Sequence, residues 1–287
     1  MDEYYRLGGR TLDTAHAYGK LEGNGVSHAE RVIGKWISTR GVRNKITLIT
    51  KGAHPPAGDL KTSRVTPECL NSDFEESIEL LGVDYVDVFF IHRDDETLPV
   101  SLLIDTMDVF VKQGKVLALG ASNWSIQRII EANDYAIKNG KTPFTVSQIQ
   151  WSLASCTPDG WGDDGLLFMD YKMLDGYQQL GIPVMAFSSQ ARGLFSKYIA
   201  DPENAITKRN DFFFTPENVR KIEAVRTVCA EYNASPAAVC LAYVTSYPMK
   251  AGASALIGSS SLEQLVDSMS GMDLTLRPET IKMLDNA

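Results

Sequence analysis

This sequence of 287 residues lacks several of the features by which a protein class is most easily assigned. No apolar run approaches the ~18 residues of a membrane span, and the start, Met1-Asp2-Glu3, is acidic and unlike a signal peptide. The four cysteines form no CxxC pair, which argues against a zinc knuckle or a disulfide framework. We therefore expect a cytoplasmic protein without a membrane partner.

Basic charge and nucleotide-binding motifs are sparse as well. Lys and Arg number 28 against 36 Asp and Glu, the net charge is −8, and no basic run occurs, so a nucleic-acid partner is not expected. Neither a GxGxxG fingerprint nor a P-loop is present, which disfavours a doubly wound nucleotide-binding sheet. The four histidines form no HxH pattern, which disfavours a metal-dependent hydrolase. The composition, 44% hydrophobic and 22% charged, is typical of a globular protein.

Short apolar runs alternate with amphipathic stretches along the whole chain. Several runs are almost entirely apolar, which favours parallel strands that are buried on both faces. The pattern predicts seven strands, at Arg10–Ala15, Lys45–Gly52, Val86–Arg93, Val116–Asn123, Thr145–Trp151, Pro183–Gln190 and Ser254–Ser260.

Helix signals fill the intervening segments. A capping box begins at Ser27, Thr66-Pro67 opens a helix that should end at Gly82, and Pro99 opens another that should end at Gly114. Two more helices should start at Thr215-Pro216 and Ser235-Pro236, whereas residues 154 to 170 form the longest irregular stretch. Strand–helix alternation of this kind predicts parallel βαβ units.

A (β/α)8 barrel explains the even spacing best, although it needs eight strands and the pattern supplies seven. The shortfall lies at the front, where Tyr4–Leu7 resembles the end of a helix with no strand before it. We therefore expect one barrel domain over residues 1–287 that lacks an N-terminal hairpin and the first strand. An open barrel would also expose unpaired strand edges.

Polar side chains stand where the predicted strands end. In a parallel barrel these C-terminal ends meet on one rim, which carries the active site. Each side chain has an ordinary structural explanation on its own, but an acid, an amine, an imidazole and carboxamides together are costly to desolvate and favour a site. The residues are Asp13, Lys51, His92, Ser122, Asn123, Gln148, Ser188 and Gly258-Ser259.

Several motifs at these ends resemble the aldo-keto reductase family. Asp13-Thr-Ala-His-Ala-Tyr-Gly19, Thr50-Lys51 and Ile91-His92 follow the first three strands, and Gly120-Ala-Ser-Asn-Trp124, Ser147-Gln148 and Ala186–Gly193 come later in the expected order. The likeness runs from about residue 10 to the end. It implies a (β/α)8 fold and the reduction of aldehydes and ketones to alcohols by hydride transfer from NAD(P)H.

The resemblance also implies a catalytic tetrad of Asp13, Tyr18, Lys51 and His92. Carbonyl reduction needs a proton donor for the oxygen as hydride reaches the carbon, and Tyr18 would be this general acid. Lys51 would stabilise the phenolate that remains, and Asp13 would hold Lys51 in place. His92 would orient the substrate carbonyl by a hydrogen bond.

Cofactor contacts follow from the same resemblance. Ser122, Asn123 and Gln148 would hold the nicotinamide carboxamide, and Phe187 would stack on its ring where many members have tyrosine. Ser188, Gln190 and Arg192 would lie along the pyrophosphate. Exposed N–H groups before a helix that starts near Leu262 would suit the adenosine phosphate end. The residues expected there are Gly258, Ser259, Ser260 and Gln264.

The cofactor type, the substrate and the alternatives remain open from the sequence. The family resemblance favours NADP(H). Gly258 and Gln264 stand where many NADP-binding members have Lys and Arg, which leaves NAD(H) possible. His16, Trp124 and Trp161 are predicted to line the substrate pocket, whereas His28 and His54 are interpreted as surface or capping residues. The missing strand motivates one alternative, a non-catalytic cofactor-binding or scaffold protein on the same fold. The physiological substrate and the oligomeric state are not determined.

Overall fold

The computed structural model describes residues 1–20, 25–208 and 210–287. These residues form two compact units. Unit 1 comprises Met1 and residues 8–147, and unit 2 comprises residues 2–7 and 148–287. The boundary falls inside one strand, β5 (Phe144–Gln150).

Unit 1 contains four complete parallel strands, β1 (Thr11–Asp13), β2 (Thr47–Gly52), β3 (Val86–Ile91) and β4 (Val116–Ser122). β1 pairs with β2, β2 with β3, and β3 with β4, all in parallel register. β2 is buried at every position after its first, and β3 is fully buried over its last three residues. The apolar runs therefore became strands that are covered on both faces, as the sequence predicts.

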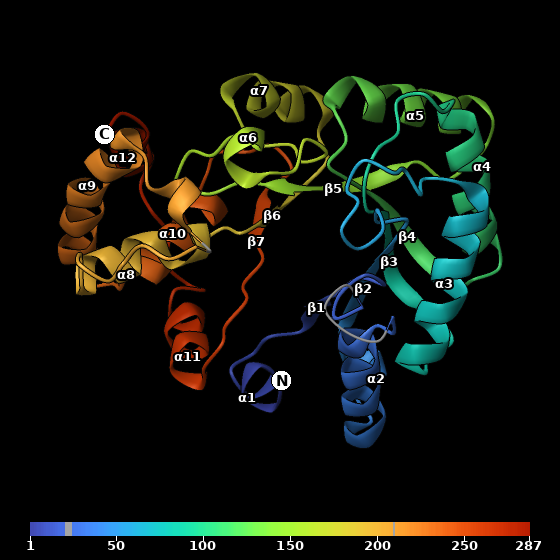
Figure 1. Ribbon diagram of the computed structural model, residues 1–287, viewed down its shortest axis with the longest axis horizontal. Coiled ribbons are helices and arrows are strands. Elements are labelled where there is room, and N and C mark those ends of the chain that lie inside the picture. The colour runs from blue at the N-terminus through green and yellow to red at the C-terminus, as the bar shows by residue number, and fades with distance from the viewer. Residues whose placement is uncertain (21–24, 209) are drawn as a thin grey trace. The chain divides into compact units, whose positions relative to one another are not determined.

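Four helices cover these strands on the outside (Figure 1). They are α2 (His28–Arg40), α3 (Pro67–Leu81), α4 (Val100–Lys112) and α5 (Ile126–Lys138), with a short 3-10 turn at Arg43–Lys45. The predicted signals fix their ends. The Ser27 and Thr66 side chains accept from the backbone N–H groups of residues 30 and 69, and Gly82 ends α3 in the left-handed conformation.

Unit 2 contains β6 (Val184–Phe187) and β7 (Ala253–Ala255), which pair in parallel. The almost wholly buried helix α10 (Pro236–Thr245) contacts α8, α9, α11 and β7, and Figure 1 shows α8, α9, α10 and α12 gathered together. The other helices are α1 (Asp2–Arg6), α6 (Pro158–Trp161), α7 (Tyr171–Leu180), α8 (Leu194–Ala200), α9 (Pro216–Tyr232), α11 (Leu262–Ser270) and α12 (Pro278–Asp285), with 3-10 turns at Ala191–Gly193 and Asp211–Phe213.

All seven predicted strands are present, and three of them are shorter than expected by at least three residues. The first ends at Asp13, because a turn closes immediately afterwards with the Tyr18 N–H donating to the Ala15 carbonyl. The sixth ends at Phe187, because Ser188 adopts the left-handed region at φ 51°. The last spans only Ala253–Ala255. The predicted irregular stretch from residue 154 to 170 contains the short helix α6.

Among the described residues, no helix combines the length and apolar character that a membrane crossing requires. The single-domain organisation remains a prediction.

Candidate active site

A fully buried ammonium group stands near the end of β2. The Lys51 side chain is 0% exposed, and its Nζ donates to Asp13 Oδ2 at 2.6 Å and to the Thr14 carbonyl at 2.8 Å. Burial alone would lower the pKa of Lys51, but the charge of Asp13 and interactions with Asp13 and Tyr18 outweigh burial and raise the pKa. Lys51 therefore stays charged at neutral pH, which is unusual for a lysine without solvent contact.

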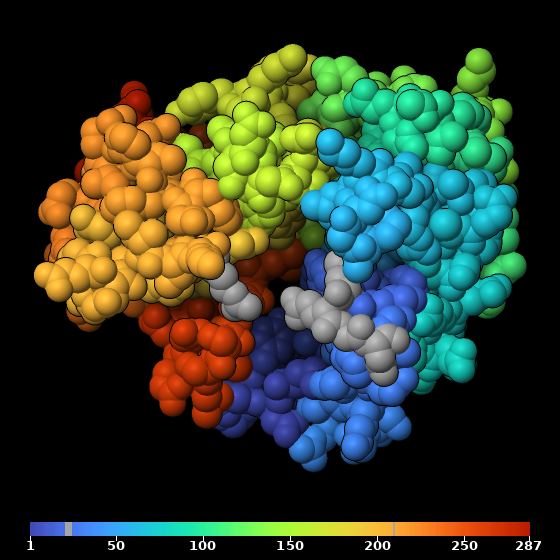
Figure 2. Space-filling view, viewed as in Figure 1, coloured from blue at the N-terminus to red at the C-terminus, as the bar shows by residue number. Residues whose placement is uncertain are grey.

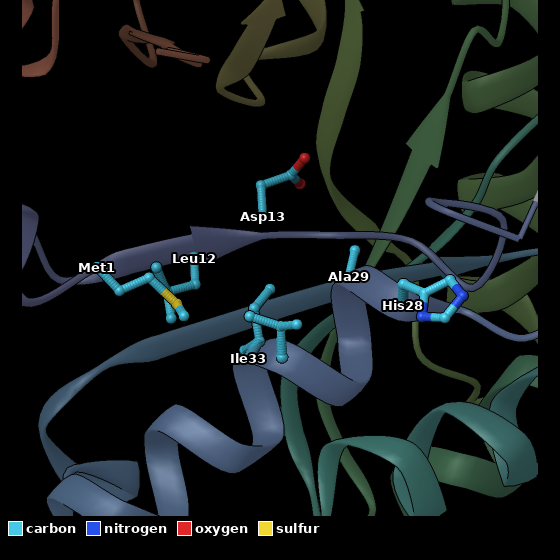
Figure 3. Close-up of a pocket in the computed structure, with 7 residues that line it drawn as sticks. Met1, Leu12, Asp13, His28, Ala29 and Ile33 are labelled. Carbon is cyan, nitrogen blue, oxygen red and sulfur yellow. The ribbon is translucent and has the colours of Figure 1, made fainter. Parts of the chain in front are cut away.

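Asp13 reaches Lys51 because it is the last residue of β1, and β1 pairs with β2. In Figure 3 its carboxylate points to the side of β1 opposite the Leu12 and Ile33 side chains. Those apolar side chains line a surface groove of about 470 Å³ that also includes Met1, Ala29 and Val32. Successive strand residues face opposite sides, so β1 presents a carboxylate to Lys51 on one face and an apolar contact to α2 on the other.

Tyr18 lies in the turn that follows β1. The carbonyl of Tyr18 accepts from the Ser27 hydroxyl at 3.0 Å and from the Ala29 N–H, which ties the turn to the start of α2. The Lys51 ammonium is 5.1 Å from the centre of the Tyr18 ring. The Tyr18 side chain is 40% exposed, so the phenol is accessible from solvent while a buried cation lies beside it.

His92 follows β3 and completes the cluster. Its ring centre is 5.7 Å from that of Tyr18, in an edge-on arrangement. Burial lowers the pKa of His92 well below its usual value, and the charges of Arg93 and Lys51 lower it further. The imidazole is therefore neutral at pH 7. Its Nδ1 atom has no hydrogen-bond partner among the described residues, although His92 is only 5% exposed. A buried polar atom of this kind is costly unless a ligand or water satisfies it.

His54 joins this cluster, although the sequence analysis interprets it as a surface or capping residue. Its ring centre is 4.6 Å from that of His92, and its Nδ1 is 2.8 Å from the Pro55 carbonyl oxygen, which can only accept. The available signal was its position three residues after Lys51, where a barrel strand passes into a loop of the catalytic face. The loop continues through residues 57–63, which are exposed and visible in light blue on the face shown in Figure 2.

The three predicted substrate-contacting residues have different environments. His16 is 3% exposed, and its ring nitrogens lie 3.3 Å from Asp73 and 2.7 Å from Glu76. Trp124 is 0% exposed and donates its Nε1 hydrogen to the Arg93 carbonyl. Both side chains are therefore almost fully buried, and their contact with a substrate stays a prediction.

Trp161 lies in unit 2 within a group of aromatic rings. It packs against Phe187 at 6.2 Å and Phe212 at 4.9 Å between ring centres. The Arg192 guanidinium lies 4.3 Å from the centre of the Trp161 ring, a cation–π distance. Phe187 and Arg192, both expected near a cofactor, thus share Trp161 as a neighbour.

Two of the predicted carboxamide-binding residues are adjacent at the end of β4. Ser122 and Asn123 are almost fully buried, and Asn123 Nδ2 lies 3.1 Å from Ser122 Oγ. Asn123 adopts a left-handed backbone at φ 58°, which Asn tolerates better than most residues. Gln148 is also buried, but it belongs to unit 2.

The segment after β6 combines several left-handed residues. Ser188, Ala191 and Arg192 have φ values of 51°, 48° and 52°. Gln190, at φ −100° and ψ 15°, precedes the left-handed Ala191. A right-handed residue followed by a left-handed one is the pattern found in anion-binding backbone concavities. The Gln190 amide donates to Ser268 on α11 at 3.0 Å.

The segment before α11 is exposed and held by side-chain hydrogen bonds. The Gln264 side-chain oxygen accepts from both the N–H and the hydroxyl of Ser260, at 3.0 Å and 2.9 Å. Ser261 caps α11 by accepting from the Gln264 N–H. Gly258 and Ser259 are exposed. The helix start near Leu262 agrees with the prediction.

A sequence model described as the Aldo/keto reductase family matches residues 1–287. The chain belongs to the aldo/keto reductase family. The chain is 30% identical over 255 residues to the aldo-keto reductase str7 of Strobilurus tenacellus. The aligned region covers 85% of this chain and 67% of str7. It is 24% identical to an aryl-alcohol dehydrogenase [NADP(+)] of Phanerodontia chrysosporium, over 100% of this chain and 74% of that protein.

A solved structure gives the same fold. The structure is that of a thermostable aldo-keto reductase crystallised with the inhibitor epalrestat. The superposition covers 98% of this chain and 83% of that reductase, with a TM-score of 0.71 and 21% sequence identity. The predicted family and barrel fold are therefore confirmed, with seven strands among the described residues where a (β/α)8 barrel has eight. Membership of this family makes the protein an oxidoreductase of a group that binds nicotinamide cofactors.

Proposed function

We propose that this protein reduces small aldehydes or ketones to alcohols with a nicotinamide cofactor, and that Asp13, Tyr18, Lys51 and His92 carry out the proton chemistry. The observation that carries the proposal is the fully buried, charged Lys51, bonded to Asp13 and placed 5.1 Å from the Tyr18 ring. A protein has little structural reason to bury an ammonium beside an exposed phenol, because the desolvation cost is large. The arrangement is useful if the phenol must lose a proton.

Tyr18 donates the proton in this proposal. A reduced nicotinamide supplies hydride to the substrate carbon when it is bound. As the carbonyl oxygen gains negative charge, the Tyr18 hydroxyl protonates it, and the phenolate that remains is stabilised by the Lys51 ammonium. Asp13 keeps that ammonium charged and in position. The exposed phenol lets a substrate reach the proton donor.

His92 orients the carbonyl in this proposal. Because its pKa is lowered, the ring is neutral at pH 7, with one nitrogen able to donate and the other able to accept. A neutral imidazole can donate one hydrogen bond to a carbonyl oxygen without competing with Tyr18 as the acid. The partnerless Nδ1 and the edge-on Tyr18 ring support this role.

The residues of unit 2 fit the phosphates of a dinucleotide. The backbone alternation at Gln190-Ala191 suits an anion, and backbone strain at Ser188 and Arg192 is typical of a functional segment. We propose that Phe187 packs on the nicotinamide ring, and that Ser188, Gln190 and Arg192 hold the pyrophosphate. Ser122, Asn123 and Gln148 would bind the carboxamide, and the segment from Gly258 to Gln264 the adenosine end.

NADP(H) is the cofactor we favour, and NAD(H) is the alternative. Support comes from the NADP(+) named for the Phanerodontia chrysosporium relative. The same relative acts on aryl alcohols by its name, which suggests an aromatic aldehyde as the first substrate to try. Trp161 and its neighbouring rings offer an aromatic surface for such a substrate.

The test is cofactor-dependent turnover of an aldehyde panel, followed as loss of reduced-nicotinamide absorbance at 340 nm. Wild-type protein should oxidise NADPH with at least one aromatic or aliphatic aldehyde. Tyr18→Phe should reduce kcat about 10²- to 10⁴-fold, the usual contribution of a general acid, without weakening cofactor binding.

Tyr135→Phe is the matched control, because it removes a tyrosine hydroxyl that donates to Asp105 on α4, outside the tetrad. It should turn over at the wild-type rate. Wild-type protein that binds cofactor but reduces none of the panel would contradict the proposal and favour the non-catalytic alternative.

A further inference from the structure

A second buried network of charged groups lies beside the tetrad, on helix α3. Its centre is Asp73, which is 1% exposed. Four donor groups surround this carboxylate. They are the Ala53 N–H at 2.8 Å, the Arg64 Nη1 at 2.9 Å and Nη2 at 2.6 Å, and the His16 Nδ1 at 3.3 Å. Such a carboxylate is satisfied at both oxygens and has little freedom to move.

Asp73 connects the two segments that carry the site. His16 belongs to the turn after β1 that contains Tyr18, and its N–H donates to the Lys51 carbonyl at 2.9 Å. Ala53 belongs to the segment after β2, directly between Lys51-Gly52 and His54. Helix α3 therefore holds both segments through one carboxylate.

The Ala53 contact fixes an unfavourable backbone. Ala53 has a φ of 62°, in the left-handed region that a residue with a Cβ rarely adopts. The bond from its N–H to Asp73 stabilises this conformation, and Arg64 reinforces it by donating to the His54 carbonyl at 3.1 Å. The His54 ring, which follows this backbone, lies edge-on to His92 at 4.6 Å between ring centres.

His16 is the other half of the network. Its Nε2 lies 2.7 Å from Glu76, and Lys20 reaches the same Glu76 oxygen at 2.8 Å. Burial alone would lower the pKa of His16, but hydrogen bonds to Asp73 and Glu76 outweigh burial and raise the pKa. Two carboxylates of one helix thus favour the charged form of an imidazole that is part of the Tyr18 turn.

We propose that Asp73 and His16 are positioning residues that hold Tyr18 and His92 at their working separation. The proposal rests on the function proposed above, since it concerns the geometry of the same four groups. Neither residue touches the reacting atoms. Asp73 acts through the backbone of the two segments, and His16 acts by fastening the Tyr18 turn to α3.

A pH dependence follows from the charge of His16. The groups that face its ring are Asp73 and Glu76 on α3, Lys20 in its own turn and Glu30 on α2, with Arg64 on the far side of Asp73. Burial raises the pKa of Glu30, whereas the pKa values of Asp73 and Glu76 on α3 are lowered, so the two α3 carboxylates ionise more readily than Glu30. Above its raised pKa, His16 becomes neutral and the turn loses its attraction to α3. Catalysis should therefore decline on the alkaline side.

The first experiment measures kcat, KM and cofactor affinity of Asp73→Asn between pH 6 and 10. The amide oxygen can still accept from Ala53, but the charge that stabilises the imidazolium is lost. We expect kcat to fall about 10- to 100-fold, as for a small misplacement of catalytic groups, while the cofactor Kd changes less than twofold. The alkaline decline in kcat should also move to lower pH.

Asp108→Asn is the matched control. Asp108 on α4 is another buried carboxylate of unit 1, 2% exposed, which binds Lys112 on the same helix and Thr142 in the segment between α5 and β5. It should lose similar stability and keep the wild-type kcat and pH profile. If both variants lose kcat equally, or if Asp73→Asn keeps the wild-type kcat and profile, the positioning role is wrong.

A second measurement does not depend on turnover. Imidazole NMR signals of wild-type protein should show His16 titrating above pH 6.5. The variant Glu76→Gln removes a part-exposed partner of His16 and is expected to fold. It should lower the titration midpoint of His16 and shift the His92 and His54 signals. Unshifted His92 and His54 signals would overturn the coupling. Inactive wild-type protein with these shifts would refute the proposed reductase while supporting the network.

Discussion

At the scale of single residues, the charge on Lys51 depends on one carboxylate, that of Asp13. Its ammonium has no contact with solvent, so the cost of removing it from water is offset by Asp13 at 2.6 Å and the Thr14 carbonyl at 2.8 Å. The same bond that stabilises the fold thus keeps the group charged for catalysis. Residues with both duties are sensitive to substitutions that change charge but not size.

Asp13→Asn tests this dependence. It leaves a buried ammonium without its counter-charge, so the free energy of unfolding at pH 7 should fall by about 3 kcal/mol. The raised pKa of Lys51 stabilises the wild type below the unfolded value near 10.4, and this stabilisation is lost as pH rises through the folded value. The free energy of unfolding of the variant should therefore fall less than that of the wild type as the pH is raised. Urea unfolding at several pH values measures both effects.

Glu131→Gln is the control for Asp13→Asn, because it removes a 57% exposed partner of Arg128 and should cost no more than about 1 kcal/mol. Equal losses in the two variants would contradict the special dependence of Lys51 on Asp13.

The site residues could be located from the sequence where the chain itself brings them to a strand end. Asp13, Lys51 and His92 end or follow neighbouring parallel strands, so their convergence follows from the strand pattern. The partners of His16 could not be found in that way. Asp73 and Glu76 lie on a helix about 60 residues later, and only the packing of α3 brings them to the turn. The sequence predicts a substrate contact for His16 but gives no sign that carboxylates bind its ring.

At the scale of elements, α2 and α3 pack with unusually close backbones. A Cβ on Gly34 of α2 would lie 2.4 Å from the Leu81 carbonyl oxygen and 2.7 Å from that of Leu80. Glycine is required there by the approach of another backbone, which cannot move aside as a side chain could. Because α3 carries Asp73 and Glu76, the separation of the two helices also sets where the network lies.

Gly34→Ala should therefore be destabilising, although alanine favours helix by up to about 1 kcal/mol. The overlap forces the helices apart at a cost of about 1–3 kcal/mol or more. Thermal unfolding should show a Tm lower by several degrees. Lys35→Ala, at the adjacent exposed position of α2, should leave the Tm nearly unchanged. A Tm for Gly34→Ala at or above the wild-type value would refute the close approach.

Element boundaries show the limit of sequence reasoning at this scale. Helix starts at Ser27 and Thr66 were predictable because capping residues act locally. The end of β6 was not, since Ser188 adopts a left-handed backbone that serine has no intrinsic preference for. Tertiary contacts decide the backbone conformation of such residues, whereas the sequence pattern predicts that the strand continues through them.

At the scale of the whole molecule, the barrel fold followed from the regular alternation of buried strands and capped helices, and the family match confirms it. Cofactor choice is the property that the fold does not decide. Gln264 and Ser260 are both uncharged and bond to each other, so neither side chain offers a positive charge to a phosphate.

Cofactor binding should stabilise the folded protein according to its affinity, by about 2.7 kcal/mol at a concentration of 100 Kd, and so raise the melting temperature. We expect NADP(H) to give a larger Tm shift than NAD(H) at equal concentration. An equal or larger shift with NAD(H) would reverse the proposed preference, and no shift with either would contradict the cofactor site.

The most direct test of the central claim is the single-turnover rate of Tyr18→Phe with saturating NADPH and an aldehyde that the wild type reduces. The account predicts that cofactor oxidation slows about 10²- to 10⁴-fold while the cofactor Kd stays within twofold of wild type. A rate within threefold of wild type would contradict the assignment of Tyr18 as the proton donor that Lys51 and Asp13 support.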